Sequence, residues 1–158
     1  MESITNNMQK YENYKEQKGH LKKALTQGFY LEAICIEYNI LEDRLESALR
    51  HSGKWKEPKS GQNPPSLQAK KNTIAKMIEE KNGLARKYFT EDFLSSIITW
   101  KKERNDLIHQ LMKQSLHTEE LKALAERGDE LVKELSRIVK NYNNALAREA
   151  KKGIAHNG

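Results

Sequence analysis

Apolar residues recur every three or four positions along most of the chain, which is the spacing of one face of an α-helix. The longest stripe predicts a helix from Phe29 to about His51, whose buried face we expect to consist of Leu31, Ile34, Cys35, Tyr38, Leu41, Leu45, Ala48 and Leu49. Because Cys35 falls within this stripe, we interpret it as a small core residue rather than a reactive thiol. No segment shows the alternation with a period of two that is typical of a half-buried β-strand.

Two further helices are delimited by glycines. The first is expected from about Tyr11 to Gln27, where Gly28 breaks the pattern. The other is expected from Leu67 to about Asn82 and stops at Gly83. Residues 84–89 are long enough for one short helical turn after it.

Two later helices begin at capping residues. Thr90 is followed by two acidic residues, which the helix dipole favours in a first turn, and this helix should reach about Lys113. Thr118 opens the last helix in the same manner, and the apolar pattern continues to about Ala150. Gly128 lies inside that pattern, where a glycine weakens or kinks a helix.

Residues 52–66 hold all three prolines of the chain and are expected to form a loop. Trp55 lies there between two lysines and can be interpreted as a base-stacking residue. We favour the alternative that its large ring pins the loop onto the bundle. With residues 151–158 expected to fray, the pattern predicts one all-α domain over 1–158, an antiparallel bundle of about five helices.

The composition limits the classes of protein to which this chain can belong. A length of 158 residues fits one domain, and 28 Lys and Arg against 22 Asp and Glu give a net charge of +6. The single cysteine excludes an internal disulfide and fits a reducing compartment. The N-terminus lacks the apolar region of a signal peptide, and no apolar run is long enough to span a bilayer. We therefore expect a cytoplasmic protein with no membrane partner.

Several classes of site are excluded by their missing motifs. No glycine-rich loop follows a strand, so phosphate-loop and dinucleotide-binding sites are excluded. No HExxH motif occurs, and no cysteine and histidine residues have the spacing of zinc ligands. The sequence therefore predicts neither a metal nor a cofactor.

The helix from Glu91 to about Lys113 carries a charge on its apolar side. When it is wound at about 100° per residue, Arg104 falls about 20° from Phe93, in the middle of the apolar stripe. Asn105 and His109 are four residues apart and share a row at the edge of that stripe. An arginine on a buried face must meet a carboxylate, a second chain or an anionic ligand, because it cannot shed its charge.

One interpretation of these residues is purely structural. Arg104 would form a buried ion pair with Glu32, Glu37 or Glu42 of the second helix, or lie at the edge of a dimer. A single histidine near an apolar face is also more often packed than catalytic. The occurrence of Arg104, Asn105 and His109 together favours a functional interpretation instead.

The segment Arg104-Asn105-Asp106-Leu107-Ile108-His109 resembles the signature of the HEPN domains. That signature is an arginine, usually followed by Asn, Asp or His, and then a histidine four to six residues past the arginine, late in a helical bundle. The second helix, with EAICIEYNILEDRLESAL, looks like the long apolar helix that leads the family's bundle and often carries a functional acidic residue. On this resemblance Glu37 and Glu42 are candidate substrate-binding residues.

The resemblance implies a HEPN-like bundle of four or five helices that forms a homodimer, with two such motifs facing each other across a cleft. Many members are metal-independent endoribonucleases, often toxins or antiphage effectors, whereas others only bind nucleotides or partners. The chain keeps the arginine, the polar residue and the histidine, which favours the active branch. RNA and an antitoxin protein are then the expected partners. Unlike in some better-defined subfamilies, we expect no fused nucleotidyltransferase domain.

The residue types suit this chemistry. RNA can be cleaved without a metal when a base takes the 2′-hydroxyl proton and an acid protonates the leaving 5′-oxygen. His109 is suited to either transfer at neutral pH, and Arg104 can hold the phosphate with its forked guanidinium. We expect Asn105 to position His109 or the substrate, and Lys101 and Lys102 to attract the phosphate backbone. A symmetric dimer would supply a second histidine for the second transfer. The alternatives are a non-catalytic HEPN-like binding module and a structural dimer with Arg104 in an ion pair.

Overall fold

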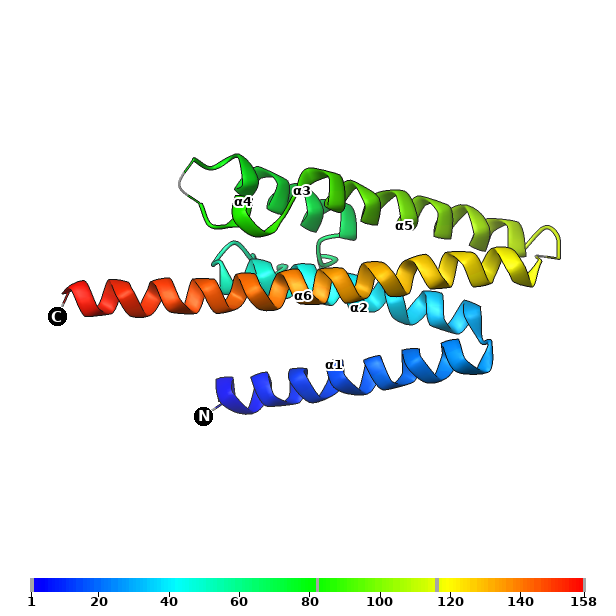
Figure 1. The fold of residues 1–158 in the computed structure, drawn as a ribbon, viewed down its shortest axis with the longest axis horizontal. Helices are drawn as coiled ribbons and strands as arrows, with labels where there is room; N and C mark the ends of the chain where they lie inside the picture. Colours follow the sequence, from blue (N-terminus) through cyan, green and yellow to red (C-terminus); the bar gives the residue numbers. More distant parts are fainter. Residues whose placement is uncertain (1, 82, 116, 158) are drawn as a thin grey trace.

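A computed structural model of the chain describes residues 2–81, 83–115 and 117–157 (Figure 1). In these ranges every regular element is an α-helix, which confirms the predicted all-α bundle. Its elements are α1 (Glu2–Gln27), α2 (Tyr30–His51), α3 (Leu67–Glu79), the single turn α4 (Ala85–Tyr88), α5 (Glu91–Leu111) and α6 (Thr118–Asn157). None of the described helices is both long enough and apolar enough to cross a membrane.

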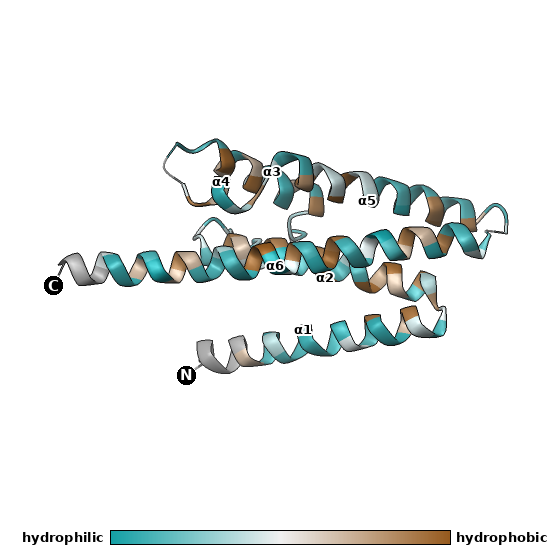
Figure 2. Cartoon of the chain, in the orientation of Figure 1, coloured by the Kyte–Doolittle hydropathy of each residue, from teal (hydrophilic) through white to brown (hydrophobic). Residues whose placement is uncertain are grey.

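Helices α2 and α6 form the centre of the bundle and run parallel to each other (Figure 1). Glu37 lies beside Gly128, and ten residues further along α2 Ser47 Oγ accepts a hydrogen bond from Asn143 Nδ2. Helix α1 packs along α2, while α3, α4 and α5 lie on the other side of the central pair. Figure 2 shows hydrophobic residues concentrated along the central stretch of α6, whereas α1 is mostly hydrophilic. The fully buried apolar side chains at this centre include Leu41 and Leu45 of α2 and Leu124 and Leu135 of α6.

Local capping explains where the outer helices begin. The Phe93 backbone N–H donates to Thr90 Oγ1 over 3.2 Å, so α5 starts at the residue after Thr90 as predicted. The Ala69 N–H donates in the same way to Ser66 Oγ over 3.1 Å at the start of α3. Gly28 has a φ of +78°, a conformation that side chains disfavour, and it separates α1 from α2.

The stripe on α2 is buried over only part of its length. Leu31 is 41% exposed, and Cys35 is also exposed, so its interpretation as a core residue is wrong. The cause is the position of α3, which covers this side of α2 only further along: Lys70 Nζ lies 3.6 Å from Glu46 Oε1. Leu31 and Cys35 lie on the N-terminal half of the same side, which α3 does not cover.

Some helix ends differ from the prediction. Helix α6 continues through Asn157 instead of ending near Ala150, although residues 147–153 are all exposed. It passes through Gly128 without interruption. Helix α3 ends at Glu79, and the predicted end at Asn82 lies outside the described residues, as does Gly158 of the predicted frayed tail.

The loop of residues 52–66 is fastened to the bundle near Trp55. The backbone N–H groups of Lys54 and Trp55 both donate to Leu49 O, over 2.9 and 3.1 Å. The half-buried indole packs against the core, with the Arg50 guanidinium carbon 4.8 Å and Lys70 Nζ 5.6 Å from its ring centroid. These contacts favour the interpretation that Trp55 pins the loop rather than stacking on a base.

Candidate functional site

Arg104 lies on the side of α5 that meets α2, where it is half-buried. Its guanidinium carbon is 4.1 Å from the centroid of the Tyr38 ring, and its Nη1 donates to Asn105 Oδ1 over 2.9 Å. Its Nε is buried and has no hydrogen-bond partner in the described structure. The anticipated ion pair with an acidic residue of α2 is therefore replaced by stacking on an aromatic ring. Stacking leaves the positive charge unneutralised and at least one N–H unsatisfied.

Tyr38 connects Arg104 to Glu42 on the same helix. Burial raises the pKa of Tyr38 above its ordinary value, and the negative charge of Glu42 and a hydrogen bond to it raise that pKa further. The positive charge of Arg104 acts in the opposite direction and lowers the pKa of Tyr38. Glu42 is half-buried, and it is the acidic candidate of α2 that the structure places beside this stack.

Glu37 lies elsewhere, because neighbouring residues on a helix point about 100° apart. Its side chain is fully buried, and neither carboxyl oxygen has a hydrogen-bond partner in the described part of the chain. Burial, reinforced by the negative charge of Asp129 on α6, raises the pKa of Glu37 from 4.5 to about 9. An enclosed carboxyl of this kind does not fit the substrate-binding role that was predicted for Glu37.

Gly128 and Trp100 form the surroundings of that carboxyl. A Cβ atom at Gly128 would lie 2.7 Å from Trp100 Cζ2 and would overlap the Glu37 carboxyl group. The Trp100 indole N–H donates to Leu124 O over 3.0 Å, one helical turn before Gly128. A glycine is therefore needed where α2, α5 and α6 meet, which explains its place inside an otherwise regular helix.

His109 is exposed in the last turn of α5, and Asn105 is half-buried one turn earlier. Residues four apart lie in one row about 6 Å apart along the axis, whereas residues five apart diverge by about 140°. The structure thus joins Arg104 to Asn105 by a hydrogen bond, but Arg104 and His109 of one chain point in different directions. Lys102 is exposed and Lys101 is half-buried on the same helix.

The apolar residues around this set are incompletely covered. In the N-terminal half of α5 the side chains of Leu94, Ile97 and Ile98 are buried, where α3 packs against the helix. In the C-terminal half Ile108 is only half-buried and Met112 is 87% exposed. Apolar surface of this kind next to a fixed charge is typical of an interaction surface.

Three well-formed grooves of the described residues are lined by residues other than Arg104, Asn105 and His109. They lie between α5 and α6 (about 570 Å³), between α1 and α2 (about 190 Å³), and between the α1–α2 corner and α6 (about 500 Å³). The candidate set thus lies on an open surface of the single chain. No cluster of three or more metal-ligating side chains is found among the described residues.

The chain matches no protein-family model, and searches of curated proteins and of solved structures gave no match. The resemblance to the HEPN domains therefore rests on the motif from Arg104 to His109 and its helical setting.

Sequence reasoning missed Tyr38 as a partner of Arg104, because its place in the apolar stripe of α2 indicated a core residue. The spacing of two residues on α2 could have indicated this contact. Tyr38 and Glu42 are four residues apart, so an aromatic ring and a carboxylate share one row on the helix expected to face Arg104.

Proposed function

We propose that the chain is a metal-independent endoribonuclease of HEPN type that works as a homodimer. The observation that carries the proposal is the state of Arg104, which is held against Tyr38 with its charge unneutralised and its Nε unsatisfied. A fixed guanidinium with unused donors is suited to bind a phosphate group. Asn105 is bonded to it, and the exposed His109 lies one turn further along.

In this proposal Arg104 holds the scissile phosphate and stabilises the charge that builds on its oxygens. His109 takes the proton of the 2′-hydroxyl, whose oxygen attacks phosphorus, and a second His109 protonates the departing 5′-oxygen. Asn105 orients the guanidinium or the substrate, and Lys101 and Lys102 attract the RNA backbone. Because Arg104 and His109 diverge on one helix, a second copy is needed to bring one chain's histidine toward the other chain's arginine.

The C-terminal half of α5 supplies the surface for that second copy. Ile108 and Met112 flank the polar set and are left uncovered by the chain's own helices. Their burial against the same residues of a partner would close the open surface into a cleft. A toxin or antiphage effector that is held in check by an antitoxin protein in the cytoplasm is the biological role that fits this activity.

A non-catalytic, nucleotide- or partner-binding helical dimer is the second candidate. It is favoured by one observation: in the single chain His109 lines none of the three described grooves. Binding would need only the anion-binding capacity of Arg104 and the surrounding lysines.

The test is incubation of the purified protein with mixed RNA, with and without EDTA. Cleavage should survive chelation and give 2′,3′-cyclic phosphate and 5′-hydroxyl ends. The His109→Ala variant should lose about 10²–10⁴-fold in rate while binding RNA nearly as well. Arg104→Ala should weaken both rate and binding, and Arg104→Lys should rescue little, because an ammonium cannot hold two phosphate oxygens.

His117→Ala is the matched control, since His117 is exposed and lies outside α5. Cleavage that persists in His109→Ala, or that stops on chelation, would contradict the proposed chemistry. RNA binding without cleavage, lost in Arg104→Ala alone, would establish the second candidate instead. Light scattering that finds only monomers at high protein concentration would count against the shared site.

A further inference from the structure

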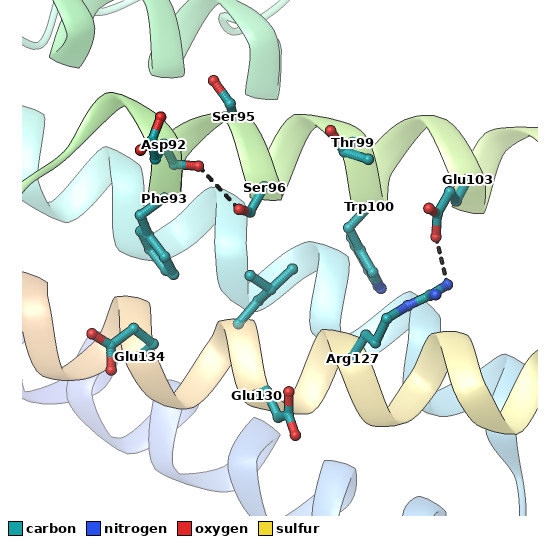
Figure 3. A pocket seen from close by; sticks show the side chains of 11 residues that line it. Asp92, Phe93, Ser95, Ser96, Thr99, Trp100, Glu103, Arg127, Glu130 and Glu134 are labelled. Atoms are coloured by element: carbon teal, nitrogen blue, oxygen red, sulfur yellow. Dashed lines mark hydrogen bonds and ion pairs between the residues drawn. The ribbon is translucent and has the colours of Figure 1, made fainter.

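A groove runs between α5 and α6 (Figure 3), and none of the candidate nuclease residues is among those that line it. It has a volume of about 570 Å³. One wall comes from α5 and the other from α6, and the lining residues are Asp92, Phe93, Ser95, Ser96, Thr99, Trp100, Glu103, Arg127, Glu130, Leu131 and Glu134. In Figure 1 α5 lies alongside α6, which itself lies in front of α2.

The charge of the groove is opposite to that of the chain. The protein carries a net charge of +6, yet the groove is lined by four carboxylates and one arginine. That arginine, Arg127, is already paired with Glu103 across the groove (Figure 3). Asp92 and Glu103 lie on the α5 wall, and Glu130 and Glu134 on the α6 wall. Glu134 is paired with Arg137, so each edge keeps one carboxylate without an ion pair among the described residues, Asp92 on α5 and Glu130 on α6. Such a surface repels RNA and attracts a cationic partner.

The side chains at the base of the groove and on its α5 wall favour a macromolecule over a small cation as the ligand. Phe93 and Leu131 are half-buried and offer apolar contact, but Trp100 is only 3% exposed and offers no ring face for a cation to stack on. The α5 wall carries the short side chains of Ser95, Ser96 and Thr99, which allow another backbone to come close. From Asp92 to Glu103 this wall extends for about 17 Å, or three helical turns.

We propose that this groove is the docking site of an amphipathic helix from another protein, one that carries Lys or Arg on both flanks of an apolar stripe. A third helix laid into the groove between two antiparallel helices is the ordinary packing of a bundle. Apolar anchors at positions i, i+3, i+4 and i+7 would cover Phe93 and Leu131. The flanking cations would face the carboxylates of the two edges, as oppositely charged flanks do in coiled coils. The site is separate from Arg104 and His109, so it stands or falls independently of the nuclease proposal.

The probe is a synthetic, fluorescein-labelled helical peptide of about five turns, with leucines in the apolar positions and Lys or Arg on both flanks. A second peptide with Glu in place of the basic residues is its control. Fluorescence anisotropy with the full-length protein should give a dissociation constant in the micromolar range for the basic peptide, since small interfaces bind weakly. The acidic peptide should not bind, and raising the salt concentration should weaken the basic one.

Variants locate the binding. Glu130→Lys should weaken the basic peptide about fivefold or more, because one attraction becomes a repulsion. Glu120→Lys, the same change on an exposed residue of α6 outside the groove, should leave it unaltered. Thr99→Trp fills the groove from the α5 wall and should abolish binding. Circular dichroism establishes that each variant is folded before it is used.

Three outcomes would overturn the proposal: equal binding of the two peptides, equal affinity of the Glu130→Lys and Glu120→Lys variants, or no binding at millimolar peptide. A dimer that dissociates in Glu130→Lys would also overturn it, because the groove would then belong to a second copy of the chain.

Discussion

The buried carboxyl of Glu37 makes the stability of the fold depend on pH. Burial and the negative charge of Asp129 raise its pKa from 4.5 to about 9 in the folded protein. At neutral pH the folded protein therefore keeps Glu37 protonated, whereas the unfolded chain releases this proton. For a raised pKa the contribution to stability is complete below pH 4.5 and is lost as the pH rises to about 9.

The magnitude follows from the two pKa values. Each pH unit between them lowers the free energy of unfolding by about 1.4 kcal/mol. At pH 7, which is about 2.5 units above the ordinary value, the loss is about 3 kcal/mol. Glu37→Gln has nearly the same shape and cannot ionise, so it removes this loss. The variant should be more stable than the wild type at pH 7 by up to about 3 kcal/mol, less whatever its buried amide costs.

Urea unfolding, followed by circular dichroism between pH 5 and 9, measures the difference in the free energy of unfolding. The advantage of Glu37→Gln should grow by about 1.4 kcal/mol per pH unit across the neutral range. Glu12→Gln, which changes an exposed glutamate of α1, is the control and should show no such growth. A difference that stays flat with pH would refute the argument that Glu37 is protonated in the fold.

Two further predictions follow from the packing. Gly128→Ala should destabilise the protein by about 1–3 kcal/mol in urea unfolding, because its Cβ would press on Glu37 and Trp100. Gly153→Ala is the control and should not destabilise the protein, because there is open space around Gly153. Equal stability of the two variants would contradict the close approach of α2 and α6. Trp55→Ala should lower the free energy of unfolding by about 1–3 kcal/mol, because the half-buried ring loses its apolar contacts, and should leave RNA affinity unchanged. A fall in RNA affinity in a filter-binding assay would show instead that this ring stacks on bases.

The sequence was sufficient for the elements whose ends depend on local chemistry. Thr90 and the two acidic residues after it predicted the start of α5, and the structure shows the expected hydrogen bond to Thr90 Oγ1. The projection of α5 also placed Arg104 correctly on the side that meets α2. These inferences succeed because capping and helical periodicity involve residues within one or two turns.

Features that depend on packing between distant helices could not be predicted in the same way. Cys35 belongs to the apolar stripe of α2, but its burial depends on whether α3 reaches that part of the helix, and it does not. The partner of Arg104 was expected to be a carboxylate, and the relative rotation of α2 and α5 made it Tyr38 instead. Gly128 was interpreted as a weakness of its helix, since only the assembled bundle reveals the side chains that occupy its space.

The pairing of α2 with α6 also affects how the protein can be made. Helix α2 leaves the ribosome before α6, which covers much of its apolar side and is synthesised only after α3, α4 and α5. Until then buried residues of α2 such as Leu41 and Leu45 lack the cover that α6 provides. The core is therefore completed only once α6 has been synthesised, and until then the nascent chain carries an exposed apolar helix. Shielding of that helix by a chaperone would matter most while α3 to α5 are being translated.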